Sequence, residues 1–204
     1  MPKPKSADLS KVTDFLFEVG TLARTPRSGQ QRFSSMPTQS VAEHVHRVVY
    51  VGYVLAHLDK KADLSKVLEL CLLHDMTETR VSDLNYIHQK YVTRDEEKAL
   101  DHMVAGLPFA NRVKERIAEY EARQTRESLL AKDADQIELL LTLKEAEDEG
   151  NAKVKSWYEF ILPRLKTEVG KQLAEQVLAS HSDTWWFGDK DPDWWTHRQN
   201  WKGK

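Results

Sequence analysis

Apolar side chains recur at every third or fourth position along most of the chain, and no segment shows the strict alternation of a half-buried strand. The few glycines lie between these apolar runs, where they are typical of breaks between helices. The sequence therefore predicts an all-α fold, a helical bundle. We expect helices near residues 7–22, 40–58, 64–78, 92–106, 109–122, 125–149, 151–160 and 163–181, with a shorter turn or helix around 184–200.

Composition narrows the classes of protein that remain. With 204 residues and 40% hydrophobic content the chain can bury a core, and no apolar stretch approaches the length of a membrane span, so no membrane partner is expected. A net charge of −2 argues against a broad surface for a nucleic acid polymer. Cys71 is the only cysteine and no signal-type apolar run follows the basic start, so we expect a cytoplasmic protein with Cys71 packed in the core.

The run at 70–78, Leu-Cys-Leu-Leu-His-Asp-Met-Thr-Glu, ends an apolar helix in two adjacent side chains that can bind a metal. His74 continues the buried stripe of that helix, and Glu78 lies one turn beyond it on the same face. Burying this polarity requires a partner. A divalent cation would be one such partner. The His74–Asp75 pair alone also fits a buried histidine hydrogen-bonded to a helix-capping aspartate.

A second buried histidine is expected upstream. Ser40 and Glu43 have the spacing of a capping box, which marks a helix start. His44 then shares one face with apolar residues four, seven and eleven positions later, so it should point inward. His46 projects elsewhere and should lie at the surface.

Taken in order, His44, the His74–Asp75 pair and an aspartate in Lys-Asp-Ala-Asp-Gln-Ile-Glu at 132–138 resemble the H…HD…D pattern of the HD-domain metal-dependent phosphohydrolases. Three segments resemble the 5′-deoxynucleotidase-like branch of that family: Ser-Val-Ala-Glu-His at 40–44, His-Asp-Met-Thr-Glu at 74–78 and Ser-Asp-Leu at 82–84. The Leu-Ala-Arg-Thr-Pro-Arg-Ser-Gly loop at 22–29 fits the same branch.

The resemblance implies one HD-type domain over residues 1–204, with a catalytic core at roughly 10–145 and a C-terminal helical segment at 150–204. It also implies one divalent cation, Mn²⁺, Co²⁺, Ni²⁺, Fe²⁺ or Zn²⁺, held by His44, His74, Asp75 and Asp135. Helical periodicity alone would favour Asp133 as the fourth ligand. The family pattern Ala-Asp-x-(Leu/Ile), matched at 134–137, favours Asp135.

The resemblance makes Glu78 and Asp83 catalytic residues. Glu78 would orient or deprotonate water, and Asp83 would do the same or contact the substrate sugar. Without the resemblance, Glu78 reads as an ordinary helix-end carboxylate and Asp83 as the N-cap of a following helix. Arg27 matches the arginine that binds phosphate in the family. Where the branch commonly carries tryptophan this chain has Gln30, whose amide suits a sugar hydroxyl, so strict preference for deoxyribose is not implied.

The expected activity is release of phosphate from nucleoside 5′-monophosphates by a metal-activated water. The alternatives are hydrolysis of nucleoside di- or triphosphates or another small phosphorylated metabolite, and a non-catalytic nucleotide-binding protein. Small proteins of this branch are often homodimers, which we expect here. Five tryptophans crowd the last twenty residues and favour packing of the C-terminus on the bundle or a subunit contact over a base-stacking platform.

Overall fold

The computed structural model describes residues 9–33 and 38–188. Within these ranges every regular element is helical, and the only β-type pairing is an isolated bridge between Pro26 and Ser40, so the expected all-α class is confirmed. The α-helices are α1 (Leu9–Val19), α2 (Val41–Leu58), α3 (Leu64–Leu73), α4 (Glu78–Val81), α5 (Glu96–Val104), α6 (Ala110–Ala122), α7 (Arg126–Asp148), α8 (Lys155–Ile161), α9 (Glu168–Ala179) and α10 (Thr184–Phe187). Short 3₁₀ helices are η1 (Gly20–Arg24), η2 (Gln30–Arg32), η3 (His88–Lys90), η4 (Ala152–Val154) and η5 (Leu162–Arg164).

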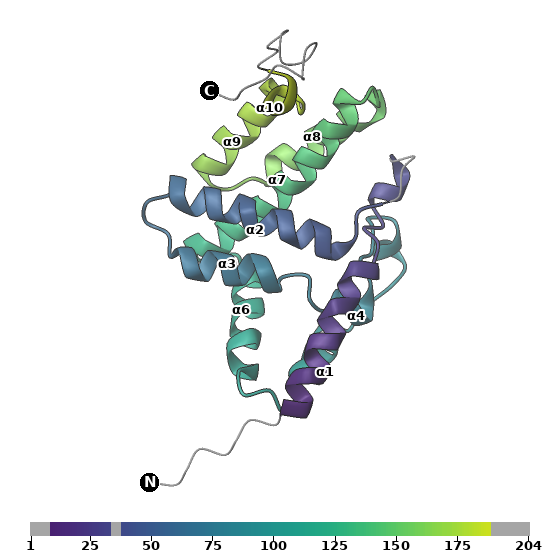
Figure 1. Cartoon of the computed structure of the whole chain (residues 1–204), viewed down its shortest axis with the longest axis vertical. Coiled ribbons are helices and arrows are strands. Elements are labelled where there is room, and N and C mark those ends of the chain that lie inside the picture. The colour runs from purple at the N-terminus through teal and green to yellow at the C-terminus, as the bar shows by residue number, and fades with distance from the viewer. Residues whose placement is uncertain (1–8, 34–37, 189–204) are drawn as a thin grey trace, which may run out of the picture.

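The long helix α7 is the centre of the bundle. It packs against α2, α3, α6, α8 and α9. In Figure 1, α2 and α3 run beside each other across the middle, with α8, α9 and α10 toward one end and α1, α4 and α6 toward the other. None of the described helices is long and apolar enough to cross a membrane.

The main core fills the space between these central helices. Leu55 of α2, Leu70 of α3 and Ile137 of α7 are fully buried in it. Gly52 permits close approach of α2 and α3, because a Cβ at this position would lie 2.5 Å from Cys71 Sγ. Cys71 is buried as expected, and burial raises the pKa of its thiol, so it packs as a small apolar side chain.

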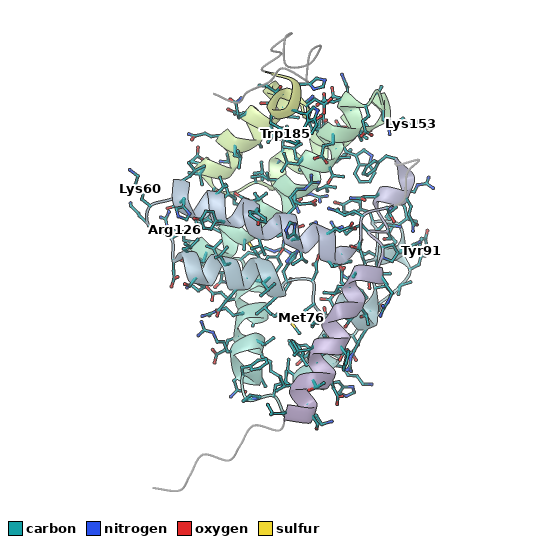
Figure 2. All side chains as sticks on the ribbon, viewed as in Figure 1. Lys60, Met76, Tyr91, Arg126, Lys153 and Trp185 are labelled. Atoms are coloured by element: carbon teal, nitrogen blue, oxygen red, sulfur yellow. The ribbon has the colours of Figure 1, made fainter. Side chains whose placement is uncertain are left out.

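The helix predicted at 64–78 is confirmed as far as Leu73 and is wrong beyond it. α3 ends at Leu73, a turn follows, and α4 begins separately at Glu78. The chain turns because Met76 packs into a second cluster formed mainly by α5 and α6, away from the axis of α3. Figure 2 shows Met76 in the interior between α1 and α6. Glu78 therefore reaches the neighbourhood of His74 across a turn and not along one helix face.

The helix predicted at 163–181 is shorter in the structure, where α9 covers Glu168–Ala179. The element expected at 184–200 lies mostly outside the described residues, and its described part is α10. Trp185 and Trp186 of α10 are 80% and 54% exposed. The other three tryptophans of the C-terminal cluster lie outside the described residues.

Candidate functional site

His44 is held at the first turn of α2 by a well-defined helix start. Ser40 Oγ accepts a hydrogen bond from the Glu43 amide, and the Glu43 carboxylate accepts one from the Ser40 amide, so the predicted capping box is present. His44 is fully buried, as predicted, and its Nδ1 lies 2.5 Å from Oε2 of Glu138 on α7. His46 is exposed, as expected.

His74 follows the last residue of α3, where the chain leaves the helix. Its Nδ1 lies 2.8 Å from the Cys71 carbonyl oxygen. A carbonyl or carboxylate oxygen only accepts hydrogen bonds, so Nδ1 of both His74 and His44 carries the hydrogen, and the lone pair of each neutral ring is on Nε2. Both Nε2 atoms are buried and have no hydrogen-bond partner.

Two carboxylates surround these imidazole nitrogens. Asp75 Oδ2 lies 3.2 Å from His74 Nε2 and 3.5 Å from His44 Nε2, and Asp135 Oδ1 lies 3.3 Å from His44 Nε2. Two ligand atoms each about 2.1 Å from one ion would lie roughly 3.0–3.4 Å apart. Buried nitrogens without partners, aimed at carboxylate oxygens with this spacing, fit a divalent cation.

The charges of the cluster stabilise one another. Burial and Arg27 oppose protonation of His44, but the carboxylates of Glu138 and Asp135 outweigh them and raise the pKa of His44 to about 9. Burial alone would raise the pKa of Asp75. His74, His44 and Arg27 lower it by more than burial raises it, so the pKa of Asp75 falls well below its usual range. The raised pKa favours a second proton, on His44 Nε2, in the metal-free chain, and a cation would have to displace that proton.

The two aspartates of α7 have different surroundings. Asp133, which periodicity favoured, is fully buried but accepts hydrogen bonds from Lys166 N, Thr167 N and Thr167 Oγ1, at the start of α9. Asp135 lies beside His44, and its Oδ2 accepts hydrogen bonds from the side chains of Lys132 at 2.7 Å and Gln136 at 3.1 Å. The structure thus brings Asp135, and not Asp133, to the other predicted ligands.

Glu78, at the start of α4, lies near the cluster and has an unpaired oxygen. It is 8% exposed, its Oε2 has no hydrogen-bond partner, and its Oε1 lies 3.8 Å from Arg94 Nη1. Burial, together with the charges of Asp75 and Asp83, raises the pKa of Glu78 to about 10. A buried carboxyl group with such a perturbed pKa in a cleft is typical of a functional residue.

Asp83 is brought back toward the cluster by an unusual backbone conformation at Ser82. Ser82 has φ 61° and ψ 158°, a region that side-chain-bearing residues rarely adopt and that costs about 1–3 kcal/mol. Asp83 then accepts a hydrogen bond from Ser28 N at 2.9 Å and lies 3.8 Å from Arg27 Nε. The alternative reading of Asp83 as a helix N-cap is wrong, because its carboxylate holds the loop at 27–28.

Arg27 lies in this loop, and Gln30 follows it at the start of η2. Arg27 Nη1 is 3.3 Å from Asp75 Oδ2, and the side chain is 15% exposed at the edge of the cluster. The Oγ of the neighbouring Ser28 is buried with no hydrogen-bond partner. Gln30 uses both ends of its amide on Gln39, donating to its Oε1 at 2.8 Å and accepting from its N at 2.9 Å. The expected sugar contact of Gln30 stays a prediction, because the structure gives its amide a role in closing the loop.

A cavity of about 950 Å³ opens from the cluster. Arg27, Gln30, His74, Asp75, Glu78, Asp83 and Asp135 all contribute to its lining, whereas His44 lies behind them, fully buried. No residue of α10 lines it. The space is large enough for a nucleotide-sized ligand.

Several residues of the site were missed by the sequence analysis. Glu138, the partner of His44, also accepts hydrogen bonds from Gln39 Nε2 at 2.9 Å and Arg47 Nε at 3.0 Å, and the His44 and Arg47 charges hold its pKa at about 2 against the effect of burial. A lone carboxylate within the apolar run Ile-Glu-Leu-Leu-Leu at 137–141 was a signal for it. Arg94, which lines the cavity beside Glu78, had no such signal.

Comparisons with known proteins agree with this geometry. The family model of the HD domain matches residues 19–177. The chain is 31% identical over 139 residues to the human 5′-deoxynucleotidase HDDC2, covering 66% of this chain and 67% of the relative, and 29% identical over 175 residues to the bovine protein of that name, covering 82% and 84%.

A conserved hypothetical protein from Pyrococcus furiosus has a similar structure, with a TM-score of 0.70 and 28% identity over 82% of this chain and 99% of that one. The matching family model spans most of the chain, including both imidazoles and both carboxylates of the cluster described above. The chain therefore belongs to the HD-domain family.

Proposed function

We propose that this protein is a metal-dependent phosphohydrolase that releases phosphate from nucleoside 5′-monophosphates. The observation that carries the proposal is the pair of buried, unpartnered Nε2 atoms of His44 and His74, set among carboxylate oxygens at the inner end of a large cavity. The names of the human and bovine relatives support a nucleotide substrate.

His44, His74, Asp75 and Asp135 would hold one divalent cation, Mn²⁺, Co²⁺, Ni²⁺, Fe²⁺ or Zn²⁺. When bound, such a cation supplies Lewis-acid chemistry: it acidifies water, neutralises charge on phosphoryl oxygens and lowers the pKa of nearby carboxyl groups. The two Nδ1–H bonds, to Glu138 and to the Cys71 carbonyl, keep both imidazoles oriented with Nε2 toward the centre.

Arg27 binds the phosphate in this proposal. Its guanidinium is already oriented by Asp75 and Asp83, and it stays charged because these carboxylates outweigh the effect of burial on its pKa. Remaining N–H groups of the planar fork can donate to two phosphate oxygens.

Glu78 is the acid or base of the reaction in this proposal. Its unpartnered Oε2 lies in the cavity wall, where it can orient a water molecule and accept its proton, and later return a proton to the departing 5′ oxygen. Asp83 keeps the Arg27 loop in place and adds a second carboxylate at the same end of the cavity.

A substrate screen tests this function. The purified protein would first be analysed for bound metal, and phosphate release would then be measured with Mn²⁺, Co²⁺ or Ni²⁺ on nucleoside mono-, di- and triphosphates in ribose and deoxyribose forms. We expect turnover of 5′-monophosphates that is lost in Asp75→Asn. No turnover of any substrate, in a preparation that binds metal, would contradict the proposal.

The expected homodimer and cytoplasmic location belong to this proposal as well. Light scattering behind a size-exclusion column measures the oligomeric state, and fractionation of the native cell measures the location. A monomer at micromolar concentration would contradict the first expectation.

A further inference from the structure

One part of the cavity lining combines an exposed tyrosine and a partly buried tryptophan with a cation. We call Tyr86, Trp157 and Arg164 the aromatic wall. The rings of Tyr86 and Trp157 are 6.3 Å apart between centroids, and Arg164 Cζ lies 5.0 Å from the Tyr86 centroid while its Nη1 donates to the Tyr86 hydroxyl. Tyr86 is 47% exposed, and all three line the cavity together with Leu139 and Pro163.

A single buried amide connects the aromatic wall to the predicted metal cluster. Gln136, 5% exposed, donates from Nε2 to Asp135 Oδ2 at 3.1 Å and accepts at Oε1 from Arg164 Nη1 at 3.4 Å. Only one glutamine side chain therefore separates Arg164 from the aspartate beside His44. A ligand whose phosphate reaches the cluster would have its other end near this wall.

Arg164 has donors to spare for such a ligand. Within the described residues its two hydrogen bonds both use Nη1, and it forms no ion pair with a carboxylate. A guanidinium carries five N–H groups, so Nε and Nη2 are free of these contacts. An oriented arginine next to aromatic rings matches the needs of a nucleobase, which has a flat face for packing and acceptor atoms on its edge.

The rest of the cavity lining lacks these features. Among the described lining residues the only other tyrosine, tryptophan or phenylalanine ring is that of Tyr120, which is just 3% exposed. Lys132, which also lines the cavity, is already engaged by Asp135 at 2.7 Å. Tyr120 is therefore too buried to offer a base a surface for stacking.

We propose that the aromatic wall is the base subsite of the cavity, where Tyr86 or Trp157 packs against a nucleobase and Arg164 donates to acceptors on its edge. The inference rests on the proposed nucleotidase function and adds to it how the base is bound. Guanine presents two adjacent acceptors, O6 and N7, which suit the free Nε and Nη2 donors of Arg164. Among the nucleotides, dGMP should therefore lose the most affinity when Arg164 is replaced.

The test compares a nucleotide with the same sugar phosphate lacking its base. We would measure kcat/KM for dGMP and for 2-deoxyribose 5-phosphate in the wild type, in Arg164→Met and in the control Arg112→Met, which removes a surface arginine outside the cavity. In Arg164→Met, but not in the control, the dGMP to sugar-phosphate ratio should fall about 10-fold or more, mainly through KM.

A second pair of variants addresses the ring. Tyr86→Leu should lower the same ratio, and Tyr86→Phe should restore it toward wild type, because Phe keeps the stacking surface and loses only the hydroxyl. A merely structural loss would lower turnover of both substrates equally. Equal loss on dGMP and on the sugar phosphate, whether from structural damage or from lost phosphate binding, would overturn the inference.

A binding measurement separates this inference from the catalytic proposal. With EDTA present to stop turnover, saturation-transfer NMR reports whether the H8 proton of dGMP contacts the protein. We expect a signal in the wild type that is weakened in Arg164→Met and Tyr86→Leu. If the H8 signal is present but no metal supports turnover, the proposed function is contradicted and the base subsite stands. If the wild type gives no H8 signal, the base subsite is overturned.

Discussion

Asp133 and Asp135 lie two positions apart on α7, and the matched changes Asp133→Asn and Asp135→Asn separate a structural carboxylate from a predicted metal ligand. Asn has the size of Asp but replaces one acceptor oxygen by a donor NH₂ group. Asp133 uses both oxygens, Oδ1 for Lys166 N at 2.9 Å and Oδ2 for Thr167 N at 2.8 Å and Oγ1 at 2.6 Å.

The magnitude for Asp133→Asn follows from these three bonds. The oxygen of the new amide can stay with the two Thr167 donors, N and Oγ1, and its NH₂ group then faces Lys166 N–H. One charge-assisted hydrogen bond, worth about 1.5–3 kcal/mol, is thereby lost. The two retained bonds weaken because the acceptor is neutral. We therefore expect a loss of about 3 kcal/mol in the free energy of unfolding, which for a chain of this size lowers Tm by about 6–12 °C.

Asp135→Asn should affect metal binding more than stability. Its carboxylate lies beside His44 and accepts hydrogen bonds from the side chains of Lys132 and Gln136, so neutralising it should lower the unfolding free energy of the metal-free protein by about 1–2 kcal/mol, less than Asp133→Asn does. Metal affinity should fall at least about 100-fold, since loss of a mere outer-sphere partner already costs 10–100-fold.

Differential scanning calorimetry in EDTA and isothermal titration with Mn²⁺ measure the two quantities on both variants. A Tm for Asp133→Asn within 2 °C of wild type would refute the hydrogen-bond argument. Normal Mn²⁺ affinity in Asp135→Asn, with reduced affinity in Asp133→Asn, would return the ligand role to the residue that periodicity favoured.

Three further outcomes are expected. Glu138→Gln should weaken Mn²⁺ binding about 10–100-fold, because a neutral amide holds the His44 Nδ1–H less strongly than a carboxylate does. The control Glu145→Gln should leave Mn²⁺ affinity unchanged, and a loss of affinity below threefold in Glu138→Gln would contradict the prediction. In EDTA, Tm should fall as pH rises from 6.5 to 9, because folded His44 (pKa about 9) and Glu78 (pKa about 10) keep protons that the unfolded chain has released; an unchanged Tm would contradict it. Arg27→Lys should lower kcat/KM about 100-fold by removing the fork, and a change under fivefold would exclude phosphate binding by this residue.

Local chemistry explains what could be predicted early. The start of α2 was predictable because a capping box involves only neighbours in sequence, and the burial of His44 because α2 has a single apolar stripe. The His74–Asp75 pair also stood out, since two polar side chains at the end of an apolar run require a partner. The break between α3 and α4 could not be foreseen, because it depends on Met76 packing against the distant helices α5 and α6.

The central helix α7 marks the limit of such arguments. Other helices surround it, so it buries Ala134 and Ile137 together with Asp133, Asp135 and Glu138, and no single apolar stripe exists to assign its faces. By itself the sequence determined a helical protein with two inward histidines and an adjacent aspartate, because these follow from periodicity and short-range hydrogen bonds. Only the tertiary structure decided which α7 carboxylate meets those histidines and where Arg164 lies, because both depend on the directions from which α2 and the α8–α9 segment approach the same helix.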